Sequence, residues 1–189
     1  MVYRLWLSPF AATKLEPVRR HNDLGGVRRV LDVGCGPGTD TRYFPHAEYI
    51  GVDYNLRYLD YARRRYGKHF VVADVAGGVP LRAAAFDFVL VNSFFHHLDA
   101  AASRRVLSDL QALLSDDGHV HILDLVMPQV RSVARALARW DRGQFARRLD
   151  EWQGLFSEFF EPVLIEPYAV TAAGVAIWNM VYFKGRRRT

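Results

Sequence analysis

One stretch near the start of the chain constrains its fold more than any other. Residues 30–33 form a short apolar run that predicts a buried strand. Glycine follows at every second position, at Gly34, Gly36 and Gly38. Glycine permits a left-handed turn and lets a ligand approach the bare backbone. A strand, a glycine turn and a helix just beyond are typical of the first unit of a nucleotide-binding α/β sheet.

The glycine spacing separates two classes of nucleotide. The dinucleotide fingerprint G-x-G-x-x-G would place its third glycine where this chain has Thr39. The chain instead reads D-x-G-x-G-x-G from Asp32 to Gly38. This pattern resembles motif I of the class I S-adenosylmethionine (SAM)-dependent methyltransferases. We expect Thr39 or Asp40 to cap the helix that follows.

A second predicted strand, residues 49–53, ends in a carboxylate. A carboxylate at a strand tip can accept hydrogen bonds from both hydroxyls of a ribose. The resemblance places the ribose-binding acid at this position, which is Asp53. The alternative is that Asp53 only caps the helix expected to begin near Asn55.

A third predicted strand, residues 70–74, also ends in an acid. The resemblance implies that Asp74 accepts a hydrogen bond from the adenine amino group and that the backbone N–H of Val75 donates to a ring nitrogen. Both contacts suit the donors and acceptors of these groups. The alternative is that Asp74 only forms the turn before Gly77.

The segment FDFVLVNSFFHHL, residues 86–98, resembles the fourth-strand motif of the same family. Parallel strands carry ligands at their carboxyl ends, so we expect the strand tips to share one rim. The predicted cofactor-binding residues are Asp32, Gly34, Cys35, Gly36, Gly38, Asp53, Tyr54, Asp74, Val75, Asn92 and Ser93.

Two histidines after the fourth strand, His96 and His97, are the candidate catalytic residues. A neutral imidazole suits a general base that deprotonates a methyl acceptor. The alternative is that one of them packs against or caps the next helix. No metal is predicted, because no acidic cluster surrounds the fourth strand and Cys35 is the sole cysteine.

The composition predicts a single domain in the cytoplasm. A chain of 189 residues that is 50% hydrophobic can form a sizeable core. It has no apolar run near the roughly 20 residues of a membrane span, and no secretory signal is expected. The net charge of +5 permits a nucleic-acid partner without arguing for one. Its basic residues concentrate at 63–65 and 184–188.

The expected fold is α/β: a doubly wound, seven-stranded, mostly parallel Rossmann-like sheet with a C-terminal antiparallel strand, in three α/β/α layers. Residues 1–29 would form an N-terminal lid or packing segment, with a helix over 10–20 interrupted at Pro17. Trp6, Phe10 and Lys14 could line this lid. Residues 30–126 would form the cofactor-binding core.

Residues 127–189 would supply the acceptor side of the domain. We expect helices over 130–149 and 150–160, then an antiparallel hairpin of strands 162–170 and 176–184. A turn is expected at 116–118. The aromatic stretch 152–160 is a candidate homodimer interface.

Two functions remain open at this point. The first is methyl transfer from SAM, with S-adenosylhomocysteine (SAH) as product, to an O, N or C atom of a small-molecule acceptor. The second is a methyltransferase-fold binding or regulatory subunit with a protein or RNA partner and no catalysis of its own. A nicotinamide-dependent oxidoreductase is a distant third because of Thr39.

Overall fold

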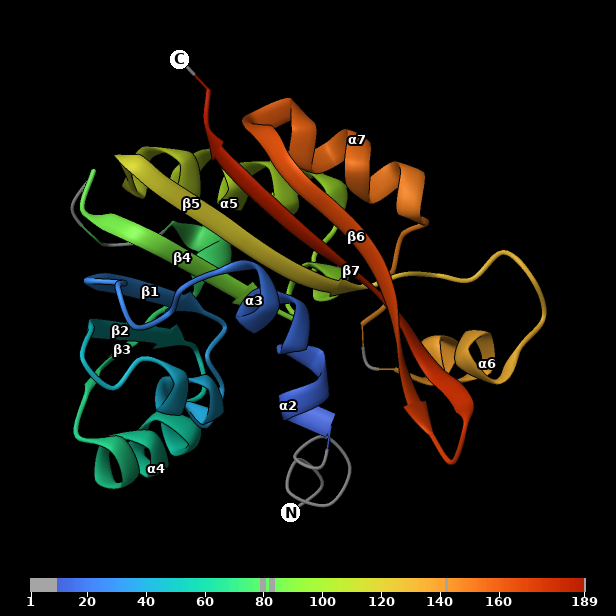
Figure 1. Cartoon of the computed structure of the whole chain (residues 1–189), viewed down its shortest axis with the longest axis horizontal. Coiled ribbons are helices and arrows are strands. Elements are labelled where there is room, and N and C mark those ends of the chain that lie inside the picture. Colours follow the sequence, from blue (N-terminus) through green and yellow to red (C-terminus); the bar gives the residue numbers. More distant parts are fainter. Residues whose placement is uncertain (1–9, 79–80, 82–83, 142, 189) are drawn as a thin grey trace.

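A computed structural model describes residues 10–78, 81, 84–141 and 143–188. Within these residues the strands form one seven-stranded sheet in the order β3-β2-β1-β4-β5-β7-β6 (Figure 1). The strands are β1 (Arg29–Val33), β2 (Glu48–Asp53), β3 (His69–Val72), β4 (Phe86–Asn92), β5 (Leu114–Leu125), β6 (Phe160–Ala172) and β7 (Val175–Arg187).

The sheet is parallel from β3 to β5, and β7 runs antiparallel to both of its neighbours. This confirms the predicted sheet and its final hairpin. The strand order reverses between β1 and β4, and ligands of open α/β sheets bind at such a reversal, outside the carboxyl ends of the strands.

Helices cover both faces of the sheet and confirm the three layers. The α-helices are α2 (Ala11–Lys14), α3 (Glu16–His21), α4 (Leu56–Tyr66), α5 (Ala100–Leu113), α6 (Val133–Trp140) and α7 (Leu149–Phe159). One core cluster joins α5 and α7 to the sheet, and a second joins α3 and α4 to it. None of the helices in the described ranges is both long and apolar enough to cross a membrane.

Local sequence signals place two of these helices well. The Asn55 side chain accepts hydrogen bonds from the amides of Arg57 and Tyr58 at the start of α4, and Gly67 ends the helix in a left-handed conformation. Asp99 accepts from the amide of Ala102 (2.7 Å) and caps α5.

The predicted cap after the glycine turn is wrong. Only a short 3-10 helix, η2 (Thr39–Tyr43), follows, and its preceding residue is the left-handed Gly38 without a side-chain cap. Asp40 lies inside this helix and bonds to Asn92 instead.

The predicted turn at 116–118 is also wrong, because these residues lie within β5. Phe86 pairs with Leu114 and Phe88 with His119, so the residues between Leu114 and His119 form an irregular bulge in the strand.

Two predicted helices are shorter than expected. The helix expected over 130–149 is reduced to α6, because the backbone of Asp141 is extended and ends the helix. The chain beyond it then runs beside the end of β5, where the amide of Met127 donates to Arg147 O (2.8 Å). At the N-terminus the break falls at Leu15, and Pro17 lies in the first turn of α3, where a missing N–H is tolerated. Trp6 lies outside the described residues.

Two aromatic side chains of the stretch considered as a dimer interface, Trp152 and Phe156, are buried inside the protein. Phe156 on α7 contacts the rings of Trp152 (5.2 Å between centroids), Phe95 (5.8 Å) and Phe183 (5.2 Å), and all four are fully buried. These rings join α7 to the sheet, so they are not available to a second copy.

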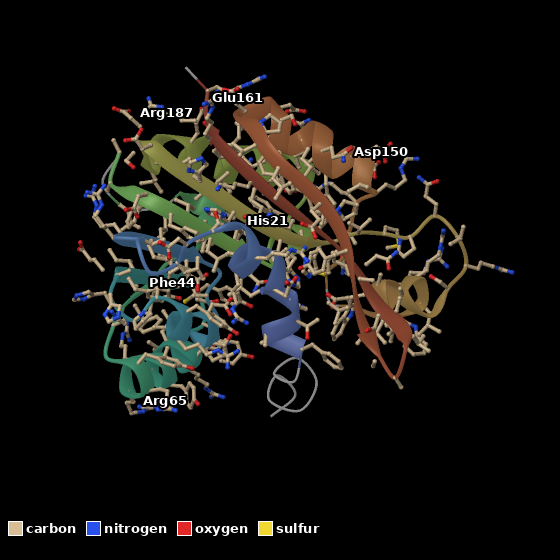
Figure 2. The ribbon with its side chains drawn as sticks, viewed as in Figure 1. His21, Phe44, Arg65, Asp150, Glu161 and Arg187 are labelled. Carbon is tan, nitrogen blue, oxygen red and sulfur yellow. The ribbon has the colours of Figure 1, made fainter. Side chains whose placement is uncertain are left out.

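The two basic clusters lie apart on the surface. Figure 2 shows Arg65 at the end of α4 and Arg187 at the end of β7 on opposite sides of the view, with Phe44 in the interior. Arg186 is paired with Glu161 and Arg63 with Asp60. The two clusters therefore do not join into one continuous positive patch.

We predict that Phe156→Ala lowers the free energy of unfolding by about 3–5 kcal/mol, because it leaves a cavity between α7 and the sheet. Denaturant unfolding measures this change. Val163→Ala on β6, where the side chain is 49% exposed, is the control and should stay within about 0.5 kcal/mol of the parent. Equal effects of the two substitutions would contradict the assigned core.

Candidate functional site

The glycine turn leaves β1 at the carboxyl edge of the sheet. Gly34, Gly36 and Gly38 all have positive φ, at 69°, 53° and 74°. A Cβ atom on Gly34 would lie 2.6 Å from the Phe94 ring, whereas one on Gly36 would meet nothing within 4 Å. The backbone at Gly36 is therefore open to a ligand on a turn that only glycine fits well.

Asp53 holds this turn from the tip of β2. Its Oδ2 accepts from the amide of Gly36 (2.8 Å) and its Oδ1 from the amide of Asn55 (2.8 Å). A carboxylate has about four acceptor positions, so each oxygen can accept a further bond. Asn55, not Asp53, caps α4, and Tyr54 beside it is 77% exposed.

Asp74 lies two residues beyond the end of β3, which is shorter than predicted. Its Oδ1 accepts from the amide of Ala76 (3.1 Å) at the start of the 3-10 helix η3 (Val75–Gly77). Asp74 therefore makes the turn contact, and this single bond still leaves it acceptor capacity toward a ligand. Val75 is buried in the core.

The side chains of Asp32 and Cys35 are buried in the protein rather than open to a ligand. Asp32 is buried and accepts a hydrogen bond from the Tyr49 hydroxyl. Burial raises the pKa of the Asp32 carboxyl and of the Cys35 thiol, and the nearby carboxylate of Asp40 raises that of Asp32 further. These two residues support the backbone of the site.

A polar chain crosses the rim from α2 to η2. Lys14 Nζ donates to Ser93 Oγ (3.1 Å), Ser93 Oγ donates to Asn92 Oδ1 (3.1 Å), and Asn92 Nδ2 donates to Asp40 Oδ2 (2.9 Å). The other Asp40 oxygen, Oδ1, is buried and has no hydrogen-bond partner among the described residues. Burial raises the pKa of the Asp40 carboxyl and lowers that of the Lys14 ammonium.

Lys14 contacts the C-terminal hairpin through both its side chain and its backbone. Its ammonium lies 4.9 Å from the centre of the Trp178 ring, and its backbone oxygen accepts from the Tyr168 hydroxyl (2.7 Å). Phe10 meets the same Trp178 ring edge-on at 5.4 Å. The N-terminal helix therefore forms one wall of the rim, and its role as a lid stays a prediction.

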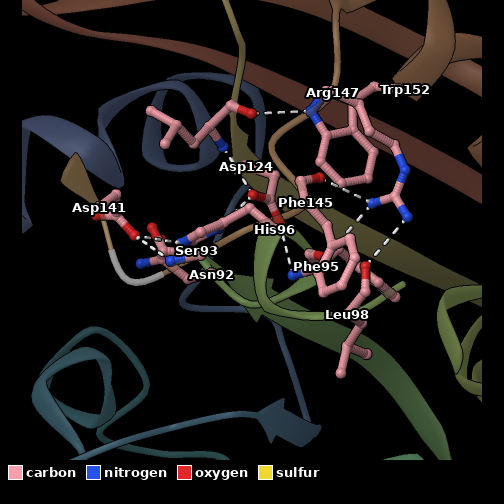
Figure 3. A network of polar contacts seen from close by, with 12 residues as sticks. Asn92, Ser93, Phe95, His96, Leu98, Asp124, Asp141, Phe145, Arg147 and Trp152 are labelled. Atoms are coloured by element: carbon pink, nitrogen blue, oxygen red, sulfur yellow. Dashed lines mark hydrogen bonds and ion pairs between the residues drawn. The ribbon is translucent and has the colours of Figure 1, made fainter. Parts of the chain in front are cut away.

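His96 lies between two carboxylates at the other end of the rim (Figure 3). Its Nδ1 is 2.6 Å from Asp124 Oδ1 and its Nε2 is 3.3 Å from Asp141 Oδ1. Burial alone would lower the pKa of His96, but the two carboxylates raise it to about 9. His96 is therefore protonated at neutral pH with both nitrogens held, which does not suit a general base.

His97 follows His96 in the 3-10 helix η4 (Phe95–His97) and is exposed. The centres of the two imidazole rings are 4.1 Å apart. One ligating atom from each of His96, His97 and Asp141 lies within 4.8 Å of the others.

Asp124 and Arg147 hold the segment around η4 in place through hydrogen bonds. Asp124 is fully buried and also accepts from the amide of Phe95 (2.7 Å). The Arg147 guanidinium donates to Leu98 O (3.1 Å) and lies over the Trp152 ring (4.6 Å; Figure 3). Four residues of this region were not among the predicted site residues, because no local motif marks them as such: Asp40, Asp124, Asp141 and Arg147.

Comparison with known proteins identifies the family. The family model of a methyltransferase domain matches residues 30–118. A malonyl-[acyl-carrier protein] O-methyltransferase of Enterobacter lignolyticus is 32% identical over 151 residues, 75% of this chain and 59% of the relative. A trans-aconitate 2-methyltransferase of Methylobacterium radiotolerans is 31% identical over 165 residues, 82% of this chain and 61% of the relative. The chain belongs to the class I SAM-dependent methyltransferases.

The fold of one solved methyltransferase structure matches that of this chain over almost its whole length. The N-methyltransferase NodS of Bradyrhizobium japonicum, in complex with SAH, superimposes with a TM-score of 0.77 at 18% identity. The match covers 99% of this methyltransferase and 92% of NodS. By contrast, the chain spans only about three fifths of the length of the two curated relatives.

We predict that Asp124→Asn lowers the free energy of unfolding by about 3–5 kcal/mol, because it leaves His96 without its buried carboxylate partner. Denaturant unfolding at neutral pH measures the loss. The control is Asp150→Asn, which breaks an exposed pair with Arg148 and should change stability by less than about 1 kcal/mol. A stable Asp124→Asn variant would remove Asp124 from this structural role.

Proposed function

We propose that this methyltransferase uses SAM to methylate an O, N or C atom of a small-molecule acceptor. The observation that carries the proposal is one rim that brings together the open turn at Gly36 and the carboxylates of Asp53 and Asp74. The methyltransferase activities in the names of the two curated relatives support it.

The residues of the rim fit the nucleoside half of SAM. The open backbone at Gly36 offers room for the ligand, and Asp53 has acceptor capacity for two ribose hydroxyls. Asp74 and the Val75 amide are the proposed adenine contacts. Tyr54 is exposed next to Asp53 and is the proposed neighbour of the ribose.

The polar chain across the rim fits the amino-acid half of SAM, which carries both an ammonium and a carboxylate. Asp40 Oδ1 is a buried acceptor that no described residue reaches, and burying such an atom is costly unless a donor bonds to it. Lys14 offers an ammonium with three N–H groups, and within the described part of the chain one of them donates to Ser93. We assign Asp40 to the ligand ammonium and Lys14 to its carboxylate.

SAM supplies a methyl group already activated on a sulfonium. The work left to the chain is to hold the acceptor atom close and in line with that methyl and to exclude water. Of the two histidines, His97 is the better candidate for acceptor contact, because both nitrogens of His96 are held by carboxylates.

We predict that the purified chain binds SAM and SAH but not NAD in a calorimetric titration. Asp53→Asn should weaken SAH binding by about 10- to 100-fold, since a hydrogen bond to a charged group contributes about 1.5–3 kcal/mol. Asp60→Asn on the exposed face of α4 is the matched control and should bind normally. A chain that folds but binds neither SAM nor SAH would favour the non-catalytic binding subunit.

We predict that Lys14→Met weakens SAH binding by about tenfold or more and leaves adenosine binding unchanged, because adenosine lacks the amino-acid half. Calorimetric titration with both ligands gives the comparison within one variant. Equal losses for SAH and adenosine would place Lys14 at the nucleoside instead.

A further inference from the structure

We propose that His96, His97 and Asp141 form a binding site for a divalent transition-metal ion such as Zn²⁺. Each residue offers one ligating atom, and the three atoms lie within 4.8 Å of one another. His96 and His97 come from η4, at the rim that β4 forms, and Asp141 follows α6. The site therefore lies beside the proposed cofactor site but uses none of its assigned residues.

The spacing of the best-placed pair fits a tetrahedral ion. His96 Nε2 and Asp141 Oδ1 are 3.3 Å apart. Two ligands at about 2.0–2.1 Å from a tetrahedral zinc are themselves separated by about 3.3–3.4 Å. An ion can therefore replace the proton that His96 shares with Asp141 without a large displacement of either side chain.

The surroundings already orient the ligands. Asp124 holds His96 Nδ1 at 2.6 Å, and this carboxylate–histidine pairing fixes an imidazole so that its Nε2 faces the ion. Asp141 Oδ1 accepts from the amide of Gly143 (2.9 Å), and Gly143 lies so close to the His96 ring that a Cβ would be 2.0 Å from it. Both ligands are thus held in position by buried neighbours.

The donor set and the local charge select the class of ion. Two imidazole nitrogens and one carboxylate favour zinc, iron or cobalt over magnesium and calcium, which prefer oxygen ligands. Asp124 and Asp141 together carry two negative charges, which a dication on neutral imidazoles balances. The Lys14 ammonium interacts electrostatically with both of these carboxylates and with that of Asp40.

Three protein ligands leave at least one position of a tetrahedral ion open. Oxygen or nitrogen atoms of an acceptor can fill it, so the preferred acceptors would carry a metal-binding group. This last step rests on the proposed function, whereas the metal site itself does not.

The test is calorimetric titration of chelator-treated chain with Zn²⁺, together with visible absorption on adding Co²⁺. We expect one ion per chain for the parent. His97→Gln and Asp141→Asn should each weaken Zn²⁺ binding by more than about tenfold, by loss of a direct ligand. The matched controls are His46→Gln and Asp150→Asn, which change exposed side chains elsewhere and should bind as the parent does.

Circular dichroism checks that every variant is folded, and SAH binding is measured on the same samples. A folded parent that binds SAH but neither Zn²⁺ nor Co²⁺ would overturn the metal site and leave the proposed function intact. Zn²⁺ binding that is unchanged in both His97→Gln and Asp141→Asn would also overturn it. A parent that binds Zn²⁺ with the expected variant losses but no SAH would support the metal site and reject the proposed cofactor.

Discussion

The end of the rim around η4 depends on the buried contact between Asp124 and His96. It joins the end of β5 to the segment after β4, and both side chains are almost fully removed from water. An unpaired charge at either position would be costly, so each residue fixes the other. Through His96 the contact also holds Asp141, and with it the chain between α6 and α7.

The structure of the rim around Gly36 and Asp53 could be predicted from the sequence because its signals are local. The glycine turn, the acid at the tip of β2 and the Asn55 cap each depend on residues only a few positions apart. The local signal at Asp40 was misinterpreted, because an acid after a glycine turn can either cap a helix or make a long-range contact. Asp40 follows the turn as a cap would, but its side chain pairs with Asn92 across the rim.

The part of the rim around His96 and Asp141 could not be predicted, because long-range contacts build it. Asp141 meets His96 only when the chain after α6 folds back toward the end of β4, and the helix expected over 130–149 has no break at that point. Lys14 reaches Ser93 from another part of the chain. The expectation of no metal rested on the sequence around the fourth strand, where Asp141 does not appear.

The position of Cys35 gives the chain a built-in chemical reporter. This thiol is the chain's one cysteine, and it is buried beneath the glycine turn, where burial keeps it in the unreactive thiol form. An alkylating reagent can therefore reach it only when the turn opens. The rate of alkylation measures how often that opening occurs, so any ligand that closes over the turn protects a single atom.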